Sequence, residues 1–211
     1  MIKNLLTFSF ILASLFVKAQ SFTATYDFAA TTTVSGTTDP TTPPSVTGLT
    51  CGAFMAVGTP SANPNAGGRF SFVGWPVGSP TTAATYTDMT GSINPAEYYE
   101  VTLTPQAGYT LTLNTMSFTV QRSGSGIRSY AVRVSADAFT NNLPGSVGTN
   151  TNLSIQGVNE FFYNADGVTT AQNGSNINLM GATTTAPVSF RFYGWNSEAG
   201  TGTFSIDNVV F

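Results

Sequence analysis

Histidine is absent from this sequence, and cysteine occurs once, as Cys51. Without histidine, no Ser-His or Cys-His catalytic pair can form. Zinc, copper and non-haem iron sites are built largely from histidine and cysteine, so we expect no transition-metal centre either. The small and apolar neighbours of Cys51 predict a buried free thiol. Carboxylate chemistry and oxygen-ligand cations remain open.

Lysine is scarce as well, and both lysines lie within the first nineteen residues. Lys3 precedes an apolar run that ends at Val17, and this run is too short to span a bilayer comfortably. Val17 and Ala19 supply the residues at positions −3 and −1 that a signal peptidase needs. We therefore predict that residues 1–19 are a cleaved signal peptide and that the mature chain begins at Gln20.

The predicted mature chain is acidic, because it has five arginines and no lysine against ten acidic residues, a formal net charge of −5. An acidic surface does not attract nucleic acid or an anionic membrane. No later apolar stretch has the length of a transmembrane helix. We expect a protein that is secreted or held at the cell surface.

After the predicted signal, apolar and polar residues alternate repeatedly, without the three-and-four spacing of an amphipathic helix. Such alternation runs through residues 22–28, 99–103, 111–120, 130–134 and 188–192. A phase slip at Asn114-Thr115 suggests a bulge or a bend. Turn-rich stretches separate about nine or ten strands, which predicts a single all-β domain over residues 20–211, a two-sheet antiparallel β-sandwich.

One internal repeat, F-x-F-x-G-W, occurs at residues 70–75 and 190–195. In each copy two phenylalanines face the core, and the glycine allows a bulge or an exit that redirects the tryptophan. Trp75 and Trp195 then either cap the ends of the core or lie on the rim as platforms for sugar rings. Packing is the commoner use of such an aromatic residue.

A glycan-binding site would combine an exposed aromatic with polar groups that fix sugar hydroxyls. The candidate aromatics are Trp75, Trp195 and Tyr163, the last from an aromatic stretch at 161–163. If the domain binds glycan through them, at least one should be exposed. The candidate polar partners are Arg69, Arg191, Asn164 and Asp166.

The last predicted strand places an Asp207-Asn208 pair where alternation expects an inward apolar side chain, and such a pair needs a local partner. The segment Phe204-Ser205-Ile206-Asp207-Asn208-Val209, the opening Tyr26-Asp27-Phe28 and the strand at 128–135 resemble the jelly-roll domains of the galactose-binding-like superfamily and related carbohydrate-binding modules. The resemblance implies a jelly-roll-like sandwich of bacterial surface proteins.

In those families the aspartate of the last strand often helps to ligate a structural calcium, and the matching residue here is Asp207. No clear cluster of acidic residues accompanies Asp207 in the sequence. The alternative is that its side chain accepts hydrogen bonds from neighbouring turn backbone. Apart from this calcium, we expect no cofactor.

The sequence disfavours two further classes of protein, a hydrolase and an outer-membrane barrel. The closely spaced carboxylates Glu97 and Glu100 are an odd number of positions apart, so on one strand they would face opposite sides and could not flank a scissile bond. A secreted hydrolase is therefore a minor alternative. In an outer-membrane barrel the row counted back from Phe211 by twos would face lipid, yet it contains Asp207.

The sequence thus predicts a secreted, non-catalytic β-sandwich module that binds glycan or mediates surface adhesion. Its partner would be an extracellular glycan or a surface protein. A purely structural extracellular role is the main alternative.

Overall fold

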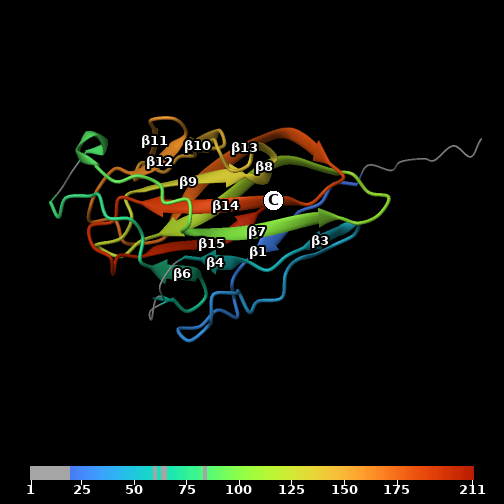
Figure 1. Cartoon of the computed structure of the whole chain (residues 1–211), viewed down its shortest axis with the longest axis horizontal. Coiled ribbons are helices and arrows are strands. Elements are labelled where there is room, and N and C mark those ends of the chain that lie inside the picture. The colour runs from blue at the N-terminus through green and yellow to red at the C-terminus, as the bar shows by residue number, and fades with distance from the viewer. Residues whose placement is uncertain (1–19, 59–60, 63–65, 83–84) are drawn as a thin grey trace, which may run out of the picture.

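The computed structural model describes residues 20–58, 61–62, 66–82 and 85–211. The predicted signal peptide lies outside the described residues. Two antiparallel sheets of seven and eight strands pack face to face (Figure 1), which confirms the predicted two-sheet antiparallel sandwich. No helix in the described part of the chain is long and apolar enough to cross a membrane.

The first sheet has the strand order β10-β13-β8-β15-β6-β5, and β1 also pairs with β15. Its strands are β1 (Thr25–Tyr26), β5 (Ser61–Ala62), β6 (Phe70–Val73), β8 (Leu111–Gln121), β10 (Gly145–Val147), β13 (Gln172–Thr184) and β15 (Phe204–Val210).

The second sheet has the order β11-β12-β9-β14-β7-β3-β2, and β4 also pairs with β7. Its strands are β2 (Ser45–Val46), β3 (Leu49–Cys51), β4 (Met55–Val57), β7 (Tyr98–Pro105), β9 (Ser129–Val134), β11 (Leu153–Gln156), β12 (Glu160–Tyr163) and β14 (Val188–Trp195). Two short 3₁₀ helices, η1 (Tyr86–Asp88) and η2 (Ser135–Asp137), lie in the connections.

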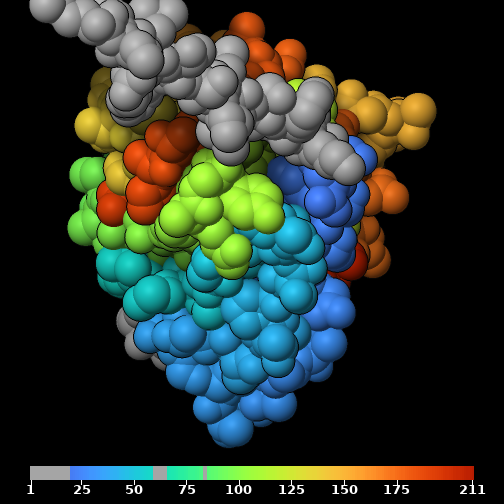
Figure 2. Space-filling view, turned by 90° about the vertical axis from the view of Figure 1, so that its right-hand side faces the viewer, coloured from blue at the N-terminus to red at the C-terminus, as the bar shows by residue number. Residues whose placement is uncertain are grey.

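The strands outnumber the nine or ten expected because several are only two or three residues long. β2 and β5 are examples, and both lie in proline- and glycine-rich stretches whose composition favours turns. Seen end-on in Figure 2, the N-terminal part that contains β1 to β4, blue to cyan, gathers at the lower side of the domain.

The core lies between the sheets and is rich in aromatic side chains, since alternate residues of each strand point inward. Tyr99 of β7 contacts the rings of both Trp75 and Phe204. Cys51 is buried and free, as predicted. The slip at Asn114-Thr115 is also confirmed, because the pairing of β8 with β13 shifts register there, between Asn178 and Ala182.

Candidate functional site

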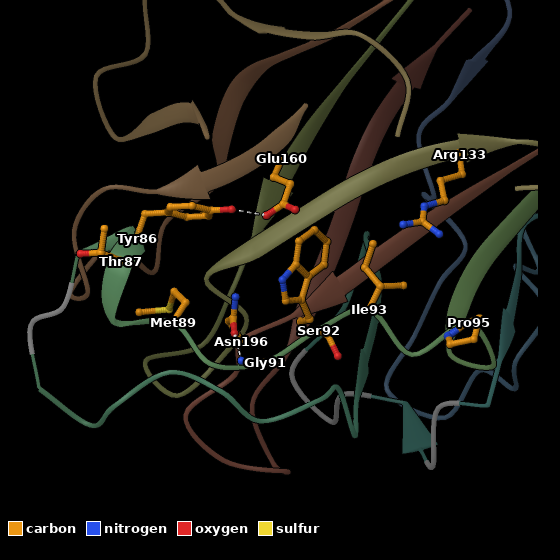
Figure 3. Close-up of a pocket in the computed structure, with 11 residues that line it drawn as sticks. Tyr86, Thr87, Met89, Gly91, Ser92, Ile93, Pro95, Arg133, Glu160 and Asn196 are labelled. Atoms are coloured by element: carbon orange, nitrogen blue, oxygen red, sulfur yellow. Dashed lines mark hydrogen bonds between the residues drawn. The ribbon is translucent and has the colours of Figure 1, made fainter. Parts of the chain in front are cut away.

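A hollow of about 720 Å³, which we call the outer-face hollow, lies on the solvent side of the second sheet beside the end of β14 (Figure 3). The sheet forms its floor, and residues 86–95, which precede β7, cross above. Its lining residues are Tyr86, Thr87, Met89, Gly91, Ser92, Ile93, Pro95, Arg133, Glu160, Trp195 and Asn196. The hollow therefore joins residues far apart in the chain.

Strand alternation explains why Trp195 lies at this floor. Phe190 and Phe192 of β14 face the core, so the odd-numbered Tyr193 and Trp195 face outward. Trp195 lies opposite Ser129 of β9, whose small side chain leaves room for the indole ring. Trp195 and Tyr193 then form a small apolar cluster outside the main core, against which Ile93 packs.

The glycine of this repeat copy has a different role from the one expected. Gly194 pairs in regular register with Tyr130, so β14 continues through it without a bulge. A Cβ atom at Gly194 would lie 2.9 Å from the ring of Phe204, so glycine is needed for close packing between the sheets. In the other copy, β6 ends at Val73 and Gly74 has a φ of 96°, which is the predicted exit.

Asn196 holds the covering segment against the sheet. Its Nδ2 donates to Ser129 Oγ at 2.9 Å, and its Oδ1 accepts the Gly91 N–H at 2.7 Å. Gly78 and Gly91 pass so closely that a Cβ atom on Gly78 would lie 2.2 Å from the Gly91 nitrogen. These contacts fix the height of the segment above the floor.

Tyr86 and Glu160 form one wall of the hollow. The Tyr86 hydroxyl donates to Glu160 Oε2 at 2.8 Å, drawn as a dashed line in Figure 3. Burial, together with this hydrogen bond to Glu160, raises the pKa of Tyr86 to about 12. Tyr86 therefore remains a neutral donor at physiological pH and holds the carboxylate in one orientation.

Arg133 forms the opposite wall, on the far side of Ile93 in Figure 3. Its Nε donates to Asn142 Oδ1 at 2.8 Å, its Nη1 donates to Phe139 O at 3.2 Å, and its guanidinium lies 5.4 Å from the centre of the Tyr193 ring. The remaining Nη2, like Glu160 Oε1, makes no hydrogen bond to the described residues. The hollow thus presents a fixed donor and a fixed acceptor.

None of the three candidate aromatics is exposed, as a glycan site built on them would require, and their burial agrees with the packing role that is commoner for such residues. Trp75 is 1% exposed, Tyr163 0% and Trp195 3%. Trp75 and Tyr163 belong to the core between the sheets, while Trp195 faces outward and is covered by residues 86–95, with Ile93 packed against it. Of the three, only Trp195 lines the outer-face hollow.

The candidate polar residues do not gather around these aromatics. Arg191 lies on the outer face of the second sheet, where it pairs with Glu100 at 2.6 Å. The rings of Tyr98 and Phe139 flank its guanidinium, with centres 4.0 and 3.8 Å away. Asn164 belongs to a turn, where its side chain bonds Ser154 and Thr151. Arg69 lies near Asp207 and affects its pKa.

Asp166 belongs to an ionic cluster around two buried arginines. Its Oδ1 lies 2.9 Å from Arg122 Nη2 and 3.4 Å from Arg128 Nη1, and Arg122 also approaches Glu198 at 3.5 Å. Both arginine side chains are fully buried. We call these four residues, Arg122, Arg128, Asp166 and Glu198, the arginine clamp.

Asp207 lies at an irregularity of β15, where the pairing with β8 shifts register. Its two carboxylate oxygens accept from the backbone and side-chain nitrogens of Asn208, at 2.7 and 3.1 Å. Burial raises the pKa of Asp207. Within the described ranges no group of three or more His, Cys, Asp or Glu residues could hold a metal ion. The local hydrogen bonds are thus present, and calcium ligation stays a prediction.

No protein-family model and no curated protein matches this sequence. Among solved structures, the chain is similar to the K1 cleaved adhesin domain of Lys-gingipain from Porphyromonas gingivalis W83, with a TM-score of 0.39, 18% identity and coverage of 90% of this chain and 97% of that one. A Stig cyclase, Fisc from Fischerella sp. TAU, gives a TM-score of 0.24 and 14% identity, over 74% of this chain and 82% of that one. Neither likeness is close enough to assign a family.

Proposed function

We propose that this protein is a non-catalytic extracellular module that binds a neutral glycan in the outer-face hollow. The observation that carries the proposal is the arrangement of Glu160 and Arg133 on opposite sides of an apolar floor, each with a hydrogen-bonding atom turned to no described residue. The extracellular location rests on the predicted signal peptide.

The chemistry of the hollow suits a sugar. Sugar hydroxyls both donate and accept, so one carboxylate and one guanidinium can each bind them, while C–H faces pack on apolar side chains such as Ile93 and Met89. A volume of about 720 Å³ falls in the usual range of ligand sites. The net negative charge of the mature chain disfavours polyanionic glycans, so we propose a neutral one.

Binding without catalysis is proposed because glycoside hydrolysis needs two carboxyl groups on either side of the scissile bond. Among the described lining residues, Glu160 is the only carboxylate. Its Oε2 is already held by Tyr86, which suits a fixed acceptor better than a proton donor.

The test is a screen of neutral glycans against purified residues 20–211, followed by calorimetry on the best ligand. Glu160→Gln and Arg133→Met should each weaken binding by roughly 10- to 100-fold, since a hydrogen bond to a charged group contributes about 1.5 to 3 kcal/mol. The matched control is Glu100→Gln, because Glu100 lies on the same sheet face outside the hollow. Equal effects of the two glutamate variants would contradict the proposal.

The burial of all three candidate aromatics favours one rival, a purely structural surface module. The variant Ser92→Phe helps to separate this rival from the glycan-binding proposal. Ser92 is exposed at the hollow, and a phenylalanine ring at this position would fill it. Our proposal requires that this variant lose glycan binding while its melting temperature stays close to that of the parent. The rival requires that no neutral glycan bind the parent protein at all.

A further inference from the structure

An apolar cleft of about 340 Å³, which we call the end cleft, opens between the two sheets at the end opposite the arginine clamp. Its deepest lining side chains are buried members of the core from three strands, Leu113 of β8, Leu179 of β13, and Val188 and Phe190 of β14. The cleft therefore reaches the core and is no shallow depression of the surface.

The cleft borders an irregular part of β13. The pairing of β13 with β8 shifts register between Asn178 and Ala182. Within the shift, Met180 and Gly181 have φ angles of 56° and 69°, and the Met180 N–H donates to Asn178 Oδ1 at 2.9 Å. Residues 178–180 and 182–184 all line the cleft. The bulge thus forms one side of its mouth.

The chemistry of the lining excludes a charged occupant. No ionisable side chain is among the described residues that line the cleft, and its polar members are Ser135, Asn178, Thr183 and Thr184. An unpaired charge moved into such surroundings loses its hydration without compensation. These hydroxyl and amide groups can instead bond an uncharged polar group at the mouth.

The size of the cleft argues for one small molecule and against a protein partner. A stable protein interface buries about 800 Å² on each side. Of the large hydrophobic side chains exposed in the described residues, only Met180 lines the cleft. A cavity of about 150 Å³ holds benzene, so 340 Å³ accommodates an aliphatic group on the order of ten carbons.

We propose that the end cleft binds one neutral amphiphile, with an alkyl chain of roughly eight to twelve carbons and an uncharged hydroxyl or amide head. The chain lies against Leu113, Leu179 and Phe190, and the head lies among the polar groups of the mouth. This site is separate from the outer-face hollow, so the two proposals stand or fall independently.

The experiment titrates residues 20–211 with 1-hexanol, 1-octanol and 1-decanol by calorimetry. Each added methylene should lower Kd about fourfold, because burying one CH₂ contributes about 0.8 kcal/mol, and decanol should bind with a stoichiometry of one. The ligand should also raise the melting temperature, and at equal concentration the tighter-binding alcohol should raise it more. Lack of saturable binding up to the solubility limit of decanol would overturn the proposal.

Two filling variants, Ala182→Phe and Ala136→Phe, locate the site. Both alanines line the cleft and are exposed at its mouth, so either variant should fold, and far-UV circular dichroism checks this. Each should weaken decanol binding at least tenfold. Ala171→Phe, at an exposed alanine just before β13 and outside the cleft, is the matched control and should leave Kd unchanged. Decanol binding retained by both filled variants would place the site elsewhere and refute the proposal.

Discussion

At one end of the sandwich two buried arginines tie the connecting loops together, whereas at the other end the sheets part around an apolar cleft. The clamp end is where the arrow of β14 points in Figure 1, and the outer-face hollow lies beside it. The cleft end contains the bulge of β13. The two ends of the sandwich therefore differ: a network of charged and polar groups closes one end, and the other end opens into an apolar cleft.

The arginine clamp joins segments that are distant in sequence. Arg122 donates to the carbonyls of Gly124, Gly126 and Ile127, and it pairs with Asp166. Arg128 donates to Tyr163 O from both Nε, at 3.2 Å, and Nη2, at 3.0 Å. Carbonyl and carboxylate acceptors compensate the desolvation of these two charges, which a buried guanidinium requires.

The cleft end relies on different forces. Its bulge contains a local hydrogen bond from Met180 N–H to Asn178 and a backbone bond from Asn178 N–H to Pro144, and Met180 itself is 77% exposed. Apolar contacts are non-directional and adapt to an occupant, while a network of charges accepts only one geometry. The comparison teaches that the two ends favour different ligands. The rigid polar network keeps the groups of the neighbouring hollow in fixed positions, whereas the apolar cleft can adapt to a flexible alkyl chain.

The first prediction tests the clamp by removing its central carboxylate. Asp166→Asn leaves Arg122 and Arg128 with one carboxylate, Glu198. Because the Asp166 side chain is 26% exposed, the variant should lower the free energy of unfolding by about 1.5 to 3 kcal/mol, the contribution of a hydrogen bond to a charged group. Urea unfolding at pH 7 measures this. The same change at the other end, Asp137→Asn, alters only local turn hydrogen bonds and should cost less than about 1 kcal/mol. If the two variants lose similar amounts of unfolding free energy, the arginine clamp does not stabilise the fold more than an ordinary surface turn does.

The buried charge at the clamp end could be predicted from the alternation of apolar and polar residues along the strands. Arg122 follows Val120 in the inward phase of β8, and Arg128 precedes Tyr130 in the inward phase of β9. Two arginines in core phase predict buried charge, and buried charge requires acidic or carbonyl partners. The same phase therefore predicts an acidic partner for the two arginines and favours Asp166 as that partner over a sugar-binding role.

Other features could not have been found locally. Alternation places Trp195 on the outer face of β14, but no pattern in residues 190–195 indicates that a segment over a hundred residues earlier covers it. The Tyr86 to Glu160 contact is non-local in the same way. The sandwich and the buried Cys51 depend on short-range periodicity and composition, whereas the hollow depends on how a loop folds back.

The second prediction concerns proton binding within the clamp. Burial raises the pKa of Glu198, and its hydrogen bond with Asp166 raises it further. A group with a raised folded-state pKa stabilises the fold while protonated, and that contribution is lost as the pH rises through the folded-state pKa. Glu198→Gln stays neutral at every pH. The variant should therefore gain stability over the parent as the pH rises from 4 to 8, by about 1 kcal/mol in urea unfolding.

The lowered pKa of Asp166 does not account for the predicted gain in stability of Glu198→Gln with rising pH. The hydrogen bond from Glu198 lowers the pKa of Asp166, with Arg122 and Arg128 acting in the same direction, so its contribution is lost only as the pH falls through the folded-state value. Glu100→Gln is the control, because it breaks a surface pair with Arg191 and should lower stability slightly at pH 7. A Glu198→Gln variant less stable than the parent at pH 8 would contradict the assignment.

The smallest expected effect lies at the cleft end, in the bulge of β13. Met180 has a φ of 56°, a conformation that costs a residue with a side chain about 1 to 2 kcal/mol and costs glycine little. Glycine also loses about 0.5 to 1 kcal/mol of conformational entropy on folding, so Met180→Gly should raise the free energy of unfolding by about 0.5 kcal/mol. Met55→Gly is the control, since Met55 is a partly exposed methionine within β4 without a positive φ, so glycine there relieves no strain and costs both entropy and side-chain packing. Opposite signs for the two variants in urea unfolding would confirm that the bulge stores strain. If both variants instead lose the same unfolding free energy, the Met180 side chain contributes packing at the mouth of the cleft. Apolar contacts would then stabilise this end of the sandwich in addition to its hydrogen bonds.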